Sequence, residues 1–345
     1  MKTPPDPLHK VRSWFAGFPL LWPVVGLVAL LAFNVIYHPG FIAVEVRDGH
    51  LYGTPVDLLH QGSKGILLAV GMTLVIASGG IDLSVGSVMA IAGALAALLA
   101  RRADTPLALV IVLPLLLAAA AGLWNGLLVT AARIQPIIAT LILMTSGRGL
   151  AMLLTGGQNV AFERPGFIFL GNGHLLGLPF TIYIVAAALA AAGLLLRRTA
   201  LGLFLESTGD NERASRACGV DPRLVKTAVY VVSGVCAGLA GLVATSNVKQ
   251  ADPIRVGEMM ELDAIFAVVV GGTALTGGRF TLAGSVIGAL LIQTLTQTMF
   301  YLGIPPPIAP VPKAIIVLTV CLLQSAGFRR DVVQLIGRPI RRSVS

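Results

Sequence analysis

The chain has 345 residues, of which 56% are hydrophobic and only 12% are charged. Soluble proteins average about 25% charged residues, so this composition excludes a soluble globular protein and indicates an integral membrane protein. The formal net charge of +9 does not indicate a nucleic-acid partner, because the lysines and arginines gather in loops that fall on one side of the predicted membrane spans. The apolar runs are continuous and do not alternate with polar residues, which predicts helices.

The N-terminus combines a basic start with a long apolar run. Lys2, Lys10 and Arg12 precede the run from Phe18 to Ile36. This run is longer than the core of about 7–15 residues that a secretory signal peptide has, and it lacks a convincing small-residue cleavage site. We therefore expect a retained signal anchor that forms the first membrane helix.

Apolar runs recur along the whole chain and predict an all-α integral membrane protein with about ten transmembrane helices in one domain, residues 1–345. The runs lie at residues 18–37, 65–81, 84–100, 107–130, 136–155, 180–196, 227–246, 262–276, 281–302 and 309–327. The second, third and eighth runs are short, and transporters place broken helices and substrate pathways at such spans. Short broken helices are therefore expected near the core.

Asp82 is a carboxylate inside an otherwise apolar stretch from Ile66 to Leu99. A charge at membrane depth costs at least about 2.5–3.5 kcal/mol, so it is retained where it meets a wet cavity, a partner or a broken backbone. Gly79, Gly80 and Gly86 supply such a break. Two roles remain open: Asp82 caps the next helix as its N-cap residue, or it lies beside a transport path.

Four more polar residues fall within the spans, namely Asn125, Gln135, Thr140 and Arg148. They either hydrogen-bond between helices, at about 0.6 kcal/mol per contact, or face a polar substrate. Arg148 needs a carboxylate or several carbonyls if it is buried, and Asp82 is one candidate partner. The three cysteines show no metal or redox spacing, and no catalytic or metal-binding group is predicted.

The longest polar segment between spans is 197–226, which carries many of the basic residues. Its centre predicts a short helix over 212–217, capped by Asp210 or Asn211 and ended by Gly219. A short helix of this kind is how permeases of ATP-binding-cassette (ABC) transporters engage their ATPase. The alternative is a solvated loop that follows the positive-inside rule.

The positions of lysine and arginine predict the orientation. With the N-terminus in the cytoplasm, residues 1–17, the 197–226 loop and a basic tail at 328–345 all lie on the cytoplasmic side. Both termini are then cytoplasmic, in agreement with an even number of spans. Arg101 and Arg102 fall outside, against the rule. Treating 65–100 as one crossing would put the 197–226 loop outside, so ten spans are preferred.

Residues Gly71 to Ser87 resemble the signature of the ribose/xylose/arabinose/galactose-type sugar ABC importer permeases. The resemblance covers nearly the whole chain in order and continues in Asn125–Leu127, Ile134–Leu141, Gly147–Gly149, Thr199–Gly219, Gly271–Thr273 and Gly277–Phe280. The galactofuranose-type branch is the most similar, through Gly122–Gly126, Thr199–Phe204, Glu261–Ala264 and Gly277–Phe280. Asp210 and Gly278–Phe280 depart from patterns common in other branches.

The resemblance implies the ABC importer permease fold, with a monosaccharide (a pentose or hexose, galactofuranose among them) carried across the bacterial inner membrane. For such a substrate we expect the path to be lined by the polar residues at membrane depth, Asp82, Ser84, Asn125, Gln135, Thr140 and Arg148. The resemblance also implies contacts with the ATPase at Glu206, Gly209, Asn211, Ala214 and Gly219.

The implied partners are an ATP-binding subunit with two nucleotide-binding domains, a periplasmic sugar-binding protein and a second permease chain, identical or related. A related chain is favoured, because the galactofuranose-like branch pairs two permeases. The chain has no Gly-x-x-x-x-Gly-Lys-Ser/Thr loop, so we expect it to be a transport subunit without enzymatic activity or cofactor, with ATP hydrolysed by the partner.

Three other functions make predictions that differ from this one. A branched-chain amino-acid ABC permease would carry a different motif in place of Gly79–Ser84. An ion-coupled secondary transporter would carry more ionisable groups at membrane depth. An intramembrane protease would need paired aspartates or a Ser/His pair, and every histidine lies outside the spans or at their edges.

Overall fold

The computed structural model describes residues 20–324, and the predicted cytoplasmic segment 1–17 and basic tail 328–345 lie outside this part. The described chain is mostly helical. Its helices are α2 (Leu21–Tyr37), α3 (Thr54–Ala77), α4 (Val85–Ala100), α5 (Leu107–Thr130), α6 (Pro136–Thr155), α7 (Pro165–Asn172), α8 (Phe180–Arg198), α9 (Leu201–Asp210), α10 (Glu212–Ala217), α11 (Pro222–Val248), α12 (Met260–Val270), α13 (Leu282–Tyr301), the 3₁₀ turn Pro306–Ile308 and α14 (Pro310–Gln324).

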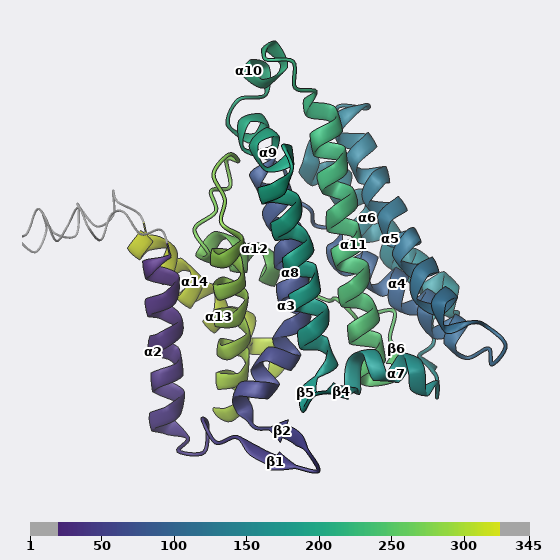
Figure 1. The fold of residues 1–345 in the computed structure, drawn as a ribbon, viewed down its shortest axis with the longest axis vertical. Coiled ribbons are helices and arrows are strands. Elements are labelled where there is room, and N and C mark those ends of the chain that lie inside the picture. The colour runs from purple at the N-terminus through teal and green to yellow at the C-terminus, as the bar shows by residue number, and fades with distance from the viewer. Residues whose placement is uncertain (1–19, 325–345) are drawn as a thin grey trace, which may run out of the picture.

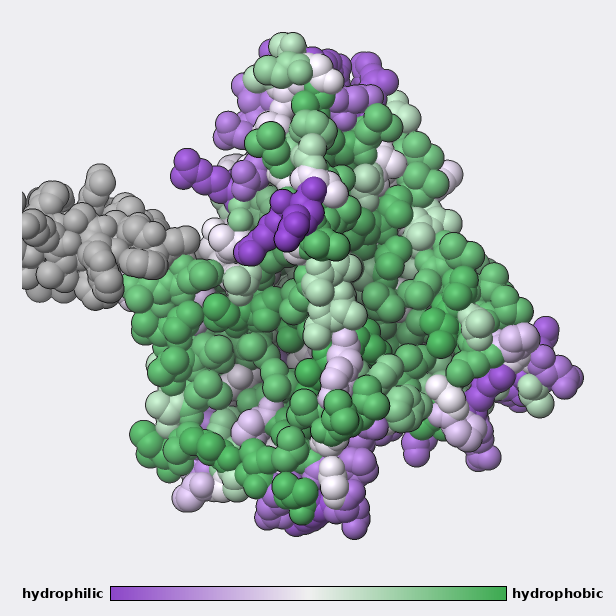
Figure 2. Space-filling model, viewed as in Figure 1, coloured by the Kyte–Doolittle hydropathy of each residue, from purple (hydrophilic) through white to green (hydrophobic). Residues whose placement is uncertain are grey.

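Three short antiparallel strand pairs complete the described structure: β1 (Glu45–Arg47) with β2 (His50–Tyr52), β3 (Val160–Ala161) with β6 (Gln250–Ala251), and β4 (His174–Leu175) with β5 (Leu178–Pro179). Figure 1 shows these pairs gathered at one end of the helix bundle, with α9 and α10 at the opposite end. We call these the hairpin end and the α10 end. Figure 2 shows an apolar belt between two polar ends, as expected for a chain embedded in lipid.

Each of the ten predicted runs contains a helix, but only six of these helices are long and apolar enough to cross a membrane by length and composition. They are α3, α5, α6, α8, α11 and α13. The all-α membrane architecture is thus confirmed at this coarser level, and ten crossings stay a prediction. α12 is the clearest departure, because its 11 residues rise about 16 Å against a hydrocarbon core of about 30 Å.

Two helix boundaries differ from the sequence prediction. α12 ends at Val270, and residues 271–281 are non-helical where a span to 276 was expected. α3 begins at Thr54, well before the expected residue 65. Its first turns contain Asp57, Gln61 and Lys64. These polar residues interrupt the apolar pattern, so the predicted span starts after them, although the backbone there is helical.

The core is built around α11, which packs against α3, α4 and α5. α3 also packs against α12 and α13, and α13 packs against α2. The buried cluster that joins these helices includes Leu67, Met72, Met89 and Val268, all fully buried. The non-helical joint 78–84 between α3 and α4 therefore lies against α11 at the centre of the molecule.

Candidate functional site

The joint between α3 and α4 places Asp82 inside the protein, where its side chain is 2% exposed. Oδ1 accepts hydrogen bonds from the Ser84 backbone N–H at 3.0 Å and from the Ser84 hydroxyl at 2.6 Å. Oδ2 accepts a hydrogen bond from the Ser233 hydroxyl of α11 at 2.9 Å. These bonds stabilise a buried carboxylate that would otherwise be costly.

The network reaches a third helix through Asn125 of α5, whose Nδ2 donates to the Ser84 hydroxyl at 2.8 Å. Asn125 is fully buried. Asp82, Ser84, Asn125 and Ser233 thus join the start of α4 to α5 and α11, and we call them the Asp82 network. Ser233 was missed by sequence reasoning, because a serine beside Gly234 in an apolar helix indicates only close helix packing.

Of the two roles left open for Asp82, the structure does not show the N-cap of the following helix. α4 begins at Val85, and its N-cap residue is Ser84, which makes no side-chain capping bond. The Asp82 carboxylate instead accepts the N–H of the residue two positions later, as in an Asx turn. Its second oxygen is directed to α11, so the carboxylate holds the joint against another helix.

The other predicted path residues lie in three places. Thr140 adjoins the network, since its hydroxyl lies 3.3 Å from the Ile81 carbonyl oxygen and 2.9 Å from that of Pro136. Gln135 precedes α6 and lines a cavity at the α10 end. Arg148 donates to the carbonyl oxygens of Val256 at 2.6 Å and Pro253 at 3.2 Å. Its described hydrogen bonds thus go to carbonyls and not to Asp82.

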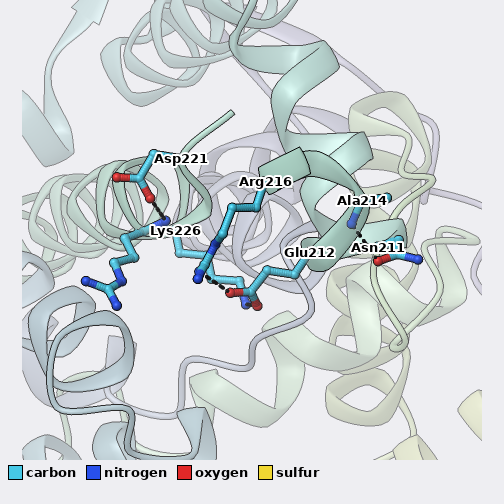
Figure 3. A network of polar contacts seen from close by, with 7 residues as sticks. Asn211, Glu212, Ala214, Arg216, Asp221 and Lys226 are labelled. Atoms are coloured by element: carbon cyan, nitrogen blue, oxygen red, sulfur yellow. Dashed lines mark hydrogen bonds and ion pairs between the residues drawn. The ribbon is translucent and has the colours of Figure 1, made fainter. Parts of the chain in front are cut away.

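At the α10 end, the predicted short helix is confirmed as α10, Glu212–Ala217. The Asn211 side chain caps it by accepting the Ala214 N–H at 3.0 Å (Figure 3). Gly219 adopts φ +86° just after the helix, a conformation that suits glycine. α9 was not predicted as a helix.

A carboxylate ties α10 to the first turns of α11. Glu212 accepts a hydrogen bond from Lys226 Nζ at 2.8 Å and forms a looser pair with Arg216 at 3.4 Å (Figure 3). The hydrogen bond from Lys226 holds the pKa of Glu212 below its usual range. Lys226 and Ser233 belong to the same helix, seven residues or about 10 Å apart along its axis. α11 therefore connects α10 with the Asp82 network.

A cavity of about 930 Å³ opens beside α10 and the start of α11. Its charged lining is mostly basic: Arg133, Arg213, Arg216, Arg223 and Lys226 face it together with Glu212. Four of the five predicted ATPase contacts, Glu206, Asn211, Ala214 and Gly219, are exposed at this end.

Gly209, the fifth, packs against the protein's own backbone. A Cβ atom there would collide with the Ala77 carbonyl oxygen and the Gly278 nitrogen, two atoms that are themselves hydrogen-bonded at 2.9 Å. The end of α9, the end of α3 and the 271–281 loop therefore meet directly before the joint that carries Asp82.

This arrangement is that of a helical membrane protein, with a non-helical joint between two central helices and a basic, helix-bearing surface at one end. Residues 54–322 match the protein family described as "Branched-chain amino acid transport system / permease component". The chain belongs to this family. Comparison with solved structures finds no match.

The curated relatives of the chain include several sugar permeases. The chain is 46% identical over 322 residues to the galactofuranose transporter permease protein YtfT of Escherichia coli (strain K12), covering 93% of each protein. It is 39% identical to the fructose import permease protein FruF of Bifidobacterium longum (strain NCC 2705), over 89% of this chain and 87% of that protein. It is 37% identical to the ribose import permease protein RbsC of Haemophilus influenzae (strain ATCC 51907 / DSM 11121 / KW20 / Rd), over 86% of this chain and 90% of that protein. The predicted resemblance to sugar importer permeases is confirmed.

Proposed function

We propose that this chain is the permease subunit of an ABC importer that moves a monosaccharide, a pentose or a hexose, into the cell. The observation that carries the proposal is the sequence of contacts from the α10 surface through the Glu212–Lys226 pair and α11 to Ser233 and Asp82. The relatives named for galactofuranose, fructose and ribose support the sugar over the branched-chain amino acid of the family description. Galactofuranose is the first candidate, because that relative has the highest of the three identities.

The proposed orientation puts the α10 end in the cytoplasm of a bacterial cell, with both termini on that side of the inner membrane. The cations at this end support it, because cytoplasmic loops carry an excess of lysine and arginine. The hairpin end then faces the periplasm, where a sugar-binding protein delivers the substrate. The ATPase subunits bind the exposed α10 surface.

In this mechanism, closure of the two nucleotide-binding domains displaces α10. The Glu212–Lys226 pair transmits the displacement to α11, and the Ser233–Asp82 bond transmits it to the joint between α3 and α4. The joint is the compliant part, because residues 78–84 belong to neither α3 nor α4. Asp82, Ser84, Asn125 and Thr140 shape the pathway there, and Gln135 and Arg148 act nearer its two ends.

Reconstitution tests this proposal. The chain is incorporated into liposomes with its ATPase, its binding protein and the second permease, and uptake of labelled galactofuranose, fructose, ribose and leucine is measured. We expect ATP-dependent accumulation of a monosaccharide and none of leucine. Accumulation of leucine alone would refute the sugar assignment.

A further inference from the structure

A second cavity, of about 700 Å³, lies in the half of the molecule nearest the hairpin end. The early turns of α3, the segment after β6, α12 and α13 form its walls. Small-molecule sites in proteins usually measure about 300–1,000 Å³, so this cavity has the size of a binding site. None of the path residues predicted from the sequence lines it.

Glutamine side chains dominate the uncharged polar lining: Gln61, Gln250, Gln293 and Gln297 all face the cavity and are half-buried. Gln61 accepts a hydrogen bond from Lys64 Nζ at 2.9 Å. Within residues 20–324, the amides of Gln293 and Gln297 form no hydrogen bond, so they remain available to a ligand. An amide group both donates and accepts, as does a sugar hydroxyl.

The charged side chains of the cavity are largely satisfied by the protein. Lys313 Nζ lies 2.7 Å from Asp263 Oδ2, with the two side chains 14% and 28% exposed. Asp252 Oδ1 accepts the backbone N–H groups of Ile254 and Arg255, each at 3.0 Å. The Lys313–Asp263 pair and the free amides suit an uncharged polar ligand. Two further cations line the cavity without an ion pair among the described residues: Lys64, which bonds to Gln61, and Arg255. Phe300 adds an aromatic surface, which suits the apolar face of a sugar ring.

The cavity wall is continuous with the start of α4. Gly257 lines the cavity, and its backbone packs directly against Gly86, in the first turn of α4. Gly86 lies only two residues after Ser84 of the Asp82 network. A displacement of the joint between α3 and α4 therefore changes the shape of this cavity.

We propose that this cavity receives the transported monosaccharide on the periplasmic side of the Asp82 network, with the amides of Gln293 and Gln297 binding its hydroxyl groups and Phe300 covering one ring face. This inference rests on the proposed function and adds a substrate site within the permease itself. Gln293 and Gln297 are four residues apart on α13 and so lie on the same helix face.

Gly65 offers a direct test by obstruction. It lies within α3 and lines the cavity, and a Cβ atom on it would meet no other atom within 4 Å. Gly65→Trp is expected to lower uptake by the reconstituted complex to the level seen without ATP, while the complex still assembles. Gly65→Ala should transport like the wild type. Gly193→Trp is the matched control, because Gly193 lies on α8, outside this cavity, and also faces open space.

Gln293→Met tests the chemistry, since it preserves the side-chain length and removes the amide. With a saturating amount of sugar-loaded binding protein, we expect its uptake to fall about 2- to 10-fold, the equivalent of one lost hydrogen bond. Gln158→Met, at an exposed loop position, is the control. Normal uptake by Gln293→Met would overturn the amide role, and normal uptake by Gly65→Trp would overturn the site. Both tests are read against sugar uptake by the wild-type complex. If the wild-type complex takes up no sugar, the proposed function is refuted instead.

Discussion

The Ser233 hydroxyl lies 2.9 Å from the carboxylate of Asp82, 151 residues away in the sequence, and is fully buried with it. This bond joins α11 to the non-helical joint between α3 and α4. Because α11 also carries Lys226, which holds Glu212 of α10, one helix connects the α10 surface with the joint between α3 and α4, two helices that pack on it.

Ser233→Ala should weaken both stability and coupling. It leaves one oxygen of the buried Asp82 carboxylate without its partner, at a cost of about 1–3 kcal/mol. We expect a lower melting temperature of the purified complex and fewer sugar molecules transported per ATP hydrolysed. Ser146→Ala is the control, because the Ser146 hydroxyl is exposed and bonds only within α6. Equal transport ratios in the two variants would contradict the coupling role of Ser233.

Asp82→Asn should preserve assembly and lower both uptake and sugar-stimulated ATP hydrolysis. The amide retains one acceptor oxygen for Ser84 but presents a donor in place of the other oxygen, against the hydroxyl of Ser233. Assembly is checked by size-exclusion chromatography and uptake with labelled sugar. Uptake equal to that of the wild type would show that Asp82 has no role in the pathway.

Cysteine crosslinking tests the ATPase contact. Ala214 and Asn211 are both exposed. Ala214→Cys disturbs the structure less, because the Asn211 side chain also caps α10. The exposed Cys218 is first replaced by Ser. We expect a crosslink to the ATPase subunit from Ala214→Cys and from Asn211→Cys, and none from Gln158→Cys. If neither α10 position crosslinks in a transport-active complex, the docking assignment fails.

Gly209→Ala should disturb the junction between α9, α3 and the 271–281 loop. The added methyl group meets backbone atoms of Ala77 and Gly278, which cannot rotate away. Such overpacking costs about 1–3 kcal/mol. A lower melting temperature and reduced ATP-driven uptake are expected, with Gly193→Ala as the control because its methyl group meets open space. An unchanged melting temperature would contradict this prediction, because it would show that α9 moves aside without loss of stability.

The second permease chain is expected to be a related protein and not a second copy. Two nucleotide-binding domains require two coupling surfaces, and each chain has one 197–226 segment. Expressed with only the ATPase and the binding protein, this chain should transport poorly and recover when a second permease gene from the same operon is added. Full uptake without that gene would establish a homodimer.

The sequence by itself determined the features that depend on near neighbours along the chain. The helix over Glu212–Ala217 was predictable with its Asn211 cap and Gly219 end, because capping and the left-handed glycine are local interactions. The break near Gly79 and Gly80 was predictable for the same reason. The apolar runs identified the helices, because burial in lipid requires continuous hydrophobicity.

Only the tertiary structure decided which distant groups meet. Asp82 accepts a hydrogen bond from Ser233, and Arg148 donates hydrogen bonds to the carbonyl oxygens of Val256 and Pro253. Each of these pairs is separated by more than 100 residues in the sequence. Hydropathy also began the second span too late in α3, because Gln61 and Lys64 look like loop residues until the fold places them on a cavity. A polar side chain within an apolar run indicates that it needs a hydrogen-bond partner when buried, but which residue becomes that partner depends on how the helices pack.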